Sequence, residues 1–356
     1  MLAVLRERFS RSLAVQVGWY NSAMADRSAP LDLLSEGERA LLRPGGPPTG
    51  SEAMKAVLTD ERFSDPGWIY ERKLDGIRCI AVRDGARVRL LSRNDLSLNG
   101  RYPELAETLG AGERTRFAVD GEVVAFEGGR TSFGRLSQRH QRPVSVFLYL
   151  FDVLWLDGCD VRPLPLRARK RLLHAALSFR DGVRLTPHRN RDGEAFYEEA
   201  CRKGWEGMIA KRADSAYTSA RSRDWLKFKC DRAQEMVIGG YTPPRGTREE
   251  LGALLLGHYR GGELLYAGKV GTGFDRAMLR ELAQRLRPLR RDHPPFADAG
   301  AIREGGATWV EPELVAQVGF AEWTRHGRLR HPRFLGLRFD KPAGEVVREG
   351  LAGLVQ

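Results

Sequence analysis

One lysine followed by a tight turn is a candidate nucleophile. Residues 70–78 read YERKLDGIR, and the two-residue period of a strand places Glu71 and Lys73 on one face. Asp75-Gly76 then turns the chain. An amine attacks phosphorus only in its neutral form, and we expect the neighbouring cation Arg78 to lower the pKa of the Lys73 ammonium. The alternative interpretation is a surface lysine beside a turn, and the segments downstream decide between the two.

Two acidic segments supply partners for such a lysine. Asp120 and Glu122 lie on one face of a strand that is otherwise apolar, where each needs either a metal ion that bridges phosphate oxygens or a salt bridge. Residues 206–211 read EGMIAK and add Glu206 and Lys211. Strict alternation puts this second pair on opposite faces, so the two share a site only if the strand bends or one of them acts from its end.

Two lysines, an aromatic residue and a C-terminal basic pair complete the candidates. Lys227 and Lys229 project from one face of a strand, where they repel unless an anion lies between them; a solvated basic strand is the alternative. Phe151 is able to stack on a nucleobase, although core packing is the commoner role of an aromatic residue. Arg338 and Lys341 are placed to grip a leaving phosphate group. The sequence has no G-x-x-x-x-G-K-[ST] motif, so no Walker loop holds a nucleotide.

Composition narrows the class of partner. The 356 residues contain 58 Lys and Arg against 46 Asp and Glu, a net charge of +12, which favours nucleic acid over a membrane surface. The 4 cysteines never approach C-x-x-C spacing, so we expect neither a zinc site nor a disulfide framework, and a reducing cytoplasm fits. No apolar run is long enough to span a bilayer, and residues 13–20 are too short and too polar for a secretion signal.

The apolar pattern predicts two domains between two terminal segments. Residues 1–52 are expected to be a poorly ordered extension, with one short helix at 31–42 and a Pro/Gly linker at 43–48. Residues 53–231 form the first domain, with strands at 68–70, 80–82, 87–91, 117–126 and 144–156 and helices at 102–109, 164–177 and 192–202. Short strands and one helix at 274–287 follow over 232–345 and suit a small barrel of the oligonucleotide-binding type. Residues 346–356 are a C-terminal tail.

Taken in order, these segments resemble the motifs of ATP-dependent DNA ligases in the covalent nucleotidyltransferase superfamily, and in particular the ligase module of bacterial end-joining ligases. The resemblance covers residues 53–345 and is carried by Lys73 to Arg78, Ser92 to Asn94, Asp120 to Glu122, Tyr149 to Asp152, Glu206 to Lys211, Trp225 to Lys229 and Arg338 to Lys341. Phe339 replaces the acidic residue that is common in this branch. The absence of a cysteine cluster separates the chain from NAD-dependent ligases, which usually carry a zinc module.

The resemblance implies an α+β fold, with an adenylation (nucleotidyltransferase) domain of antiparallel sheets and flanking helices followed by a C-terminal OB-fold β-barrel. It implies ATP with Mg²⁺ or Mn²⁺, and a Lys73 that takes AMP from ATP before AMP passes to the 5′-phosphate of a nick and is displaced by the 3′-hydroxyl. By position, the residues that contact the nucleotide are Glu71, Arg78, Arg93 and Phe151, and the residues that hold metal are Asp75, Glu122 and Glu206. The α-phosphate is held by Lys211, Lys227 and Lys229. Pyrophosphate is oriented by Arg338 and Lys341, which lie on a barrel that swings.

The resemblance also implies partners and a location. Nicked double-stranded DNA would be the substrate of a monomer in the cytoplasm, associated with the nucleoid, that acts in double-strand break end joining with a Ku-like end-binding protein and without a membrane. Two other functions remain open. An RNA ligase or a capping-type guanylyltransferase shares the lysine chemistry, and a catalytically idle nucleic-acid-binding module would keep only the fold.

Overall fold

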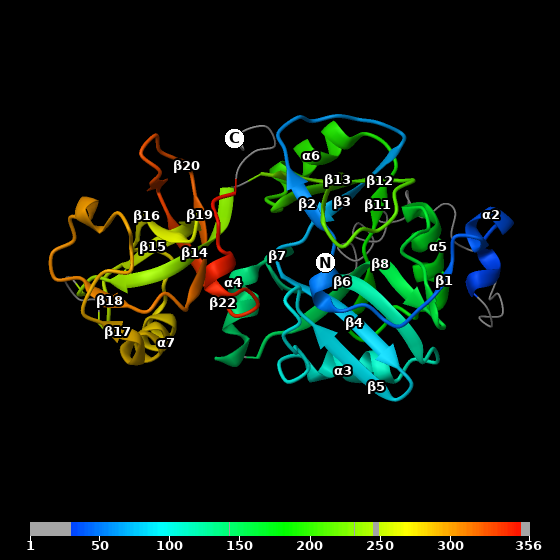
Figure 1. The fold of residues 1–356 in the computed structure, drawn as a ribbon, viewed down its shortest axis with the longest axis horizontal. Coiled ribbons are helices and arrows are strands. Elements are labelled where there is room, and N and C mark those ends of the chain that lie inside the picture. Colours follow the sequence, from blue (N-terminus) through cyan, green and yellow to red (C-terminus); the bar gives the residue numbers. More distant parts are fainter. Residues whose placement is uncertain (1–29, 142, 231, 245–248, 350–356) are drawn as a thin grey trace, which may run out of the picture.

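The computed structural model of the protein describes residues 30–141, 143–230, 232–244 and 249–349. Figure 1 shows a larger lobe, drawn in blue to green, that holds the strands up to β13, and a smaller lobe, in yellow to red, that begins at β14. The segment at 13–20 and the end of the tail lie outside the described residues. In the part that is described, no helix has the length and apolar character needed to cross a bilayer.

The first sheet of the larger lobe carries most of the core. Its strands in spatial order are β1 (Arg43–Pro44), β9 (Cys159–Asp160), β8 (Val146–Leu156), β6 (Arg116–Glu127), β4 (Ile77–Asp84) and β5 (Arg87–Leu91), with β10 (Val183–Leu185) beside β8 and β7 (Arg130–Thr131) beside β6. Neighbours are antiparallel except β10, which runs parallel to β8. Helices α3 (Pro103–Gly110) and α5 (Leu166–Ala176) bury their apolar faces against this sheet, as their helical spacing predicts.

The second sheet of the larger lobe carries the candidate nucleophile. Its order is β11 (His188–Arg189), β3 (Trp68–Lys73), β12 (Gly207–Arg212), β13 (Arg221–Lys229) and β2 (Lys55–Leu58). Helix α6 (Gly193–Arg202) packs on it through Phe196, which joins a core with Tyr70, Met208 and Phe228. The two sheets meet where Phe151 and Trp225 share an apolar cluster, so the ends of β3, β12 and β13 face the first sheet.

In its described residues, the smaller lobe is a seven-stranded antiparallel sheet with one α-helix. The order is β16 (Glu263–Val270), β15 (Leu254–Arg260), β14 (Arg232–Tyr241), β18 (Thr308–Val310) and β17 (Arg290–Arg291), and β19 (Val315–Phe320) joins β14 to β22 (Arg333–Arg338). A short hairpin of β20 (Glu322–Trp323) and β21 (Leu329–Arg330) projects from it. Helix α7 (Arg276–Leu286) begins at Asp275, whose side chain accepts a hydrogen bond from the Met278 amide. Short 3-10 turns are η3 (Gln138–His140), η4 (Arg287–Leu289), η5 (Ala299–Ala301) and η6 (Ala343–Glu345).

The lobes touch where α4 (Phe133–Ser137) lies against β22 (Figure 1). A Cβ on Gly134 would lie 2.8 Å from the carbonyl oxygen of Leu335, so the absence of a side chain permits this close approach. Nearby, the Asn94 amide donates to the carbonyl of Asp340 at 2.9 Å. This contact brings the C-terminal basic segment to the same place as the end of β3.

Residues 30–52 differ from the poorly ordered extension predicted above. The expected helix at 31–42 is instead two short elements, η1 (Pro30–Leu33) and α2 (Glu36–Arg39), because Ser35 forms a capping box and starts a new helix. The Pro/Gly stretch forms β1, which pairs with β9, and Gly45 accepts a hydrogen bond from the Trp155 indole at 2.6 Å. η2 (Gly50–Glu52) follows. The prediction of poor order is wrong for this segment because its backbone groups find partners on the first sheet.

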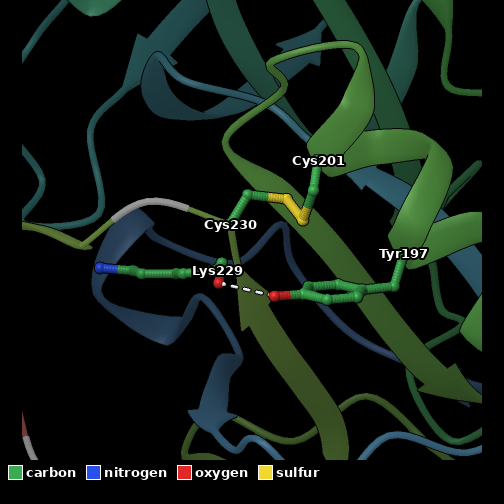
Figure 2. Close-up of a disulfide and its surroundings, with 4 residues drawn as sticks. All are labelled: Tyr197, Cys201, Lys229 and Cys230. Carbon is green, nitrogen blue, oxygen red and sulfur yellow. Dashed lines mark hydrogen bonds between the residues drawn. A yellow bond between two sulfur atoms is a disulfide. The ribbon is translucent and has the colours of Figure 1, made fainter.

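The prediction that the cysteines form no disulfide is also wrong. Cys201, in the last turn of α6, is bonded to Cys230, which follows β13, with their Cα atoms 5.1 Å apart (Figure 2). The sequence separation of 29 residues hides this pair from a spacing rule, because packing of α6 on the second sheet creates the proximity. Cys79 and Cys159 are free thiols.

Candidate active site

A cavity of about 320 Å³ lies where the two sheets and the smaller lobe meet. Of the candidates from the sequence, all but Asp120 line it: Glu71, Lys73, Asp75, Arg78, Arg93, Glu122, Phe151, Glu206, Lys211, Lys227, Lys229, Arg338 and Lys341. These residues come from seven segments that are distant in sequence. A surface lysine beside a turn does not explain such convergence.

Lys73 ends β3 opposite Gly207, and its side chain is 18% exposed. It forms an ion pair with Glu206. Burial lowers the pKa of the Lys73 ammonium, but Glu206, with Asp75 and Glu122 nearby, outweighs burial and holds the pKa above its ordinary value. The prediction of a lowered pKa is therefore wrong for this state.

Arg78 fails to lower that pKa because its charge is already matched. Its guanidinium donates to both carboxylate oxygens of Asp120, one at 2.6 Å, and Asp120 is fully buried and also accepts from the Tyr217 hydroxyl at 2.6 Å. Of the two interpretations of Asp120, the salt bridge is the one observed. The Arg78 guanidinium also lies 4.8 Å from the centre of the Phe151 ring, on the wall of the cavity.

Glu122 and Asp75 are two further carboxyl groups close enough to Lys73 to interact with its charge. Burial raises the pKa of Glu122 to about 8 despite Arg78 and Lys73, and burial together with Glu206 raises the pKa of Asp75 to about 6. One oxygen of Asp75 is committed, because it accepts from the Phe133 amide at 2.8 Å and so ties the turn after β3 to α4. Both groups therefore hold protons more readily than ordinary carboxyl groups.

Glu206 lies just before its strand, and this position explains how it shares a cavity with Lys211 although strict alternation would place the two on opposite faces. β12 begins at Gly207, whose φ of +148° and whose absent Cβ, which would lie 1.9 Å from the Phe228 carbonyl oxygen, allow the chain to bend there. Lys211 then points into the cavity from within the strand and is buried. Burial lowers the pKa of Lys211 to about 8 despite its contact with Glu71.

Glu71, another residue that lines the cavity, lies between two lysines. It is 2% exposed and is ion-paired with Lys170 and, at 2.7 Å, with Lys211. Phe151 is the extra residue of a β-bulge, because Asp120 pairs with Asp152 while Gly121 pairs with Leu150. Bulges redirect side chains, and here Phe151 lines the cavity although it belongs to a buried strand.

An anion lies between Lys227 and Lys229, as their position on one strand face predicted, but the sequence did not indicate that it is the Glu349 carboxylate. Glu349 places one oxygen 2.8 Å from each ammonium, and the two lysines outweigh burial to lower its pKa to about 2. Burial lowers the pKa of Lys227 to about 8. The sequence indicated only a tail at 346–356, and no local signal marks Glu349.

Arg338 and Lys341 are also ion-paired. Arg338 binds both oxygens of Asp340 at 2.8 and 2.7 Å, and Lys341 lies 3.4 Å from Glu235. Arg93, from the larger lobe, is 3.1 Å from the same Glu235 carboxylate. These contacts hold the basic C-terminal residues beside the cavity with the lobes closed on one another.

Phe339 packs against an arginine, and four further residues of the site were not predicted from the sequence. The Arg101 guanidinium lies 3.5 Å from the centre of the Phe339 ring, so this departure from the family pattern is absorbed by packing. Sequence reasoning missed Lys170, Tyr217, Glu235 and Glu349, because each acts through contacts made across long separations. Lys170 in particular lies on α5, outside every motif segment.

Comparison with known proteins gives consistent matches. The family model described as "ATP dependent DNA ligase domain" matches residues 51–229, and "ATP dependent DNA ligase C terminal region" matches residues 247–341. The multifunctional non-homologous end joining protein LigD of Pseudomonas aeruginosa is 42% identical over 295 residues, which are 80% of this chain and 35% of that protein. LigD of Mycolicibacterium smegmatis is 37% identical over 292 residues, 81% of this chain and 38% of that protein. The chain thus spans little more than a third of the length of these relatives.

Among solved structures, mycobacterial DNA ligase D complexed with ATP and MES matches with a TM-score of 0.62 and 35% identity, over 83% of this chain and 98% of that one. Together with the C-terminal family match, this confirms the predicted fold class of an α+β adenylation domain followed by an OB-fold domain.

Proposed function

The chain belongs to the ATP-dependent DNA ligases, and from this premise we propose that it seals nicks between 3′-hydroxyl and 5′-phosphate ends through a lysyl-AMP intermediate on Lys73, in double-strand break end joining. The observation that carries the proposal is the ion-paired, largely buried Lys73 in a cavity lined by the residues of all seven motif segments. The end-joining role is supported by the names of the relatives, each of which is much longer than this chain.

The roles of the site residues follow from their positions. Lys73, once neutral, attacks the α-phosphorus of ATP, and pyrophosphate leaves as a phosphoramidate forms at the ε-nitrogen. Lys227 and Lys229, with Lys211, hold the α-phosphate, and Arg338 and Lys341 orient pyrophosphate once their carboxylate partners release them. AMP then passes to the 5′-phosphate of the nick, and the 3′-hydroxyl displaces it.

The nucleotide's base and sugar meet a different set of side chains. Glu71 and Phe151 seat the adenine, and Arg78 and Arg93 contact the nucleotide, with Arg93 also reaching the nick. Arg78 is fixed for this task by Asp120. Holding the reactants in line in this way supplies much of the rate enhancement in phosphoryl transfer.

Glu122 and Glu206 are the residues that would hold Mg²⁺ or Mn²⁺. One oxygen of Glu206 is buried without a hydrogen-bond partner, which fits an oxygen ligand that awaits a cation. Among the described residues no cluster of three or more His, Cys, Asp or Glu is arranged for a metal, so phosphate oxygens and water would complete the shell, as Mg²⁺ prefers. When bound, the metal would offset charge on the phosphates. Asp75 contributes at most one oxygen, because Phe133 holds the other.

The remaining assignments are also proposals. We divide the chain into an adenylation domain at 53–231 and an OB-fold domain at 232–345. Nicked double-stranded DNA is the substrate, a Ku-like end-binding protein is a further partner, and the protein acts as a cytoplasmic, nucleoid-associated monomer. The net charge of +12 supports a polyanionic substrate.

Transfer of labelled AMP tests the central proposal. The wild-type chain with ATP and Mg²⁺ should form a covalent adduct that Lys73→Ala abolishes at an unchanged melting temperature. An adduct with GTP in place of ATP, or sealing of nicked RNA but not nicked DNA, would favour the guanylyltransferase or RNA ligase alternative. An adduct that survives Lys73→Ala would reject the role of Lys73.

A further inference from the structure

Lys170 is a buried cation that lies outside the cavity and contacts two residues of the cavity wall, Glu71 and Phe151. It lies on α5, is 8% exposed, and belongs to none of the motif segments. Its ammonium donates to the carbonyl oxygen of Phe151 at 3.0 Å and forms an ion pair with Glu71. Both of these partners line the cavity, whereas Lys170 does not.

The attachment of α5 to β8 gives this lysine a fixed position. Arg169, the preceding residue, donates to both oxygens of Asp152 at 2.8 and 2.9 Å, and both side chains are fully buried. Consecutive residues of the helix therefore hold Asp152 and Phe151, consecutive residues of the strand. The bulge that turns Phe151 toward the cavity is secured at both positions.

Glu71 depends on its two lysines in different ways. A carboxylate this deeply buried stays charged only when cations compensate its desolvation, and Lys170 and Lys211 outweigh burial to keep its pKa low. Lys211 lines the cavity, with its ammonium 4.1 Å from the centre of the Phe151 ring. Lys211 can therefore contact a nucleotide in the cavity, whereas Lys170 contacts Glu71 from outside the cavity.

We propose that Lys170 is a positioning residue that fixes Glu71 and Phe151 for recognition of a 6-aminopurine. The inference rests on the proposed function. An ionised carboxylate accepts a hydrogen bond from the exocyclic amino group of adenine and repels the carbonyl oxygen that guanine has at the same position. Lys170 keeps that carboxylate charged and aimed, and ties it to the ring on which the base stacks.

The test compares adduct formation by the full chain with ATP and with GTP. We expect Lys170→Met to raise the KM for ATP about tenfold and to lower the preference for ATP over GTP about tenfold, while the rate at saturating ATP changes less than about twofold. Lys170→Arg should restore both quantities. Arg171→Met is the matched control, because Arg171 lies on the same helix and pairs with Glu38 at 2.8 Å, away from the cavity.

The outcomes separate the inference from its premise. An unchanged KM and base preference in Lys170→Met, or a loss of rate at saturating ATP alone, would overturn the inference. If Lys170→Met does not fold, Lys170→Gln at reduced temperature makes the same comparison. A wild-type chain that forms no adduct would reject the proposed function instead.

The C-terminal segment carries a second, independent observation. Residues 346–349 lie along the smaller lobe, where Val346 accepts from the Tyr259 amide at 2.7 Å and Gln234 contacts both Val347 and Glu349 at 3.0 and 3.1 Å. The segment delivers the Glu349 carboxylate to Lys227 and Lys229 of the larger lobe, at 2.8 Å from each. One anion thus joins the two lobes at the lysines proposed to hold the α-phosphate.

We infer that residues 346–349 make an autoinhibitory contact, in which the Glu349 carboxylate takes the place of a phosphate group. Two oxygens on two ammonium groups reproduce the charge-assisted contacts that phosphate oxygens make. A nucleotide must displace Glu349 to reach these lysines, so the contact lowers the apparent affinity for ATP by the fraction of molecules in which it is made. This inference also rests on the proposed function.

Glu349→Gln tests the contact, with Glu349→Ala as a second variant. We expect the KM for ATP in adduct formation to fall about tenfold, with the rate at saturating ATP unchanged. Glu313→Gln removes the same charge from an exposed position of the same lobe and should leave the KM within about twofold. A KM that stays constant or rises in both Glu349 variants would overturn the inference, whereas absence of any wild-type adduct would count against the proposed function.

Discussion

Lys73 and Glu206 form an ion pair inside the cavity, with side chains 18% and 13% exposed. The carboxylate favours the ammonium form of the amine, which is not nucleophilic. Separation of this pair must precede attack on phosphorus. The arrangement differs from a lysine activated by neighbouring cations, because Asp120 already neutralises Arg78.

The raised pKa of Lys73 predicts a rate of adduct formation that climbs with pH. A higher pKa leaves less neutral amine at pH 7, so each increase in pH toward that pKa increases the reactive fraction. Glu206→Gln removes the carboxylate that stabilises the ammonium, and the rising limb should move to lower pH even though the overall rate falls. Single-turnover adduct formation between pH 6 and 10 measures the rising limb of the wild type and of Glu206→Gln. A limb that moves to higher pH in the variant contradicts the role of Glu206 in raising the pKa of Lys73.

Metal affinity should also depend on pH. Glu122, with a pKa of about 8, and Asp75, with a pKa of about 6, release protons as pH rises, and divalent metal binds the carboxylate form. The Mg²⁺ concentration that half-saturates adduct formation is expected to fall from pH 6.5 to 8.5. In Glu122→Gln that dependence should flatten above pH 7 and the requirement for Mg²⁺ should increase. A pH-independent Mg²⁺ requirement in the wild type would exclude Glu122 as a ligand.

Binding of nicked DNA is expected to weaken steeply with salt. The chain carries a net charge of +12, and each phosphate contact releases condensed counterions on binding. With about six contacts, affinity falls on the order of a thousandfold between 50 and 200 mM salt. Electrophoretic or fluorescence titrations with the Lys73→Ala variant measure this slope without turnover, and a flat response would argue against a phosphate-dominated interface.

The disulfide should stabilise the larger lobe. Cross-linking residues 29 positions apart lowers the entropy of the unfolded chain, with an expected contribution of about 3 to 4 kcal/mol. Reductant should lower the melting temperature of the wild type, while Cys201→Ser should have the lower melting temperature with and without reductant. Cys159→Ser is the control, because Cys159 is a free thiol. Equal melting temperatures for wild type and Cys201→Ser under oxidising conditions would contradict this expectation.

Local pattern predicted the parts of the site that depend on alternation along one strand. Lys227 and Lys229 share a face while Phe228 enters the core, and the need for an anion between them was correct. Strict alternation does not predict a bend that only glycine allows. The bend at Gly207 is what lets Glu206 and Lys211 line the same cavity.

Long-range partners were beyond the same reasoning. Glu349 reaches Lys227 across 122 positions, and the Cys201–Cys230 bond forms only because α6 packs on the second sheet. The pKa of Lys73 was predicted in the wrong direction for a related reason: the sequence places Arg78 five residues away but does not reveal that Asp120 neutralises it. Charge balance inside a cavity is a property of the folded arrangement.

The bond between Cys201 and Cys230 closes the intervening chain into a covalent ring that contains β12 and β13, and with them Glu206 and the three lysines proposed to hold the α-phosphate. Figure 2 shows a hydrogen bond beside the disulfide, in which the Tyr197 hydroxyl of α6 donates to the Lys229 carbonyl at 3.1 Å. The smaller lobe begins directly beyond Cys230, at β14. Any rotation of that lobe about this junction would leave β12 and β13 in place, because the disulfide and the Tyr197 hydrogen bond hold the end of β13 to α6.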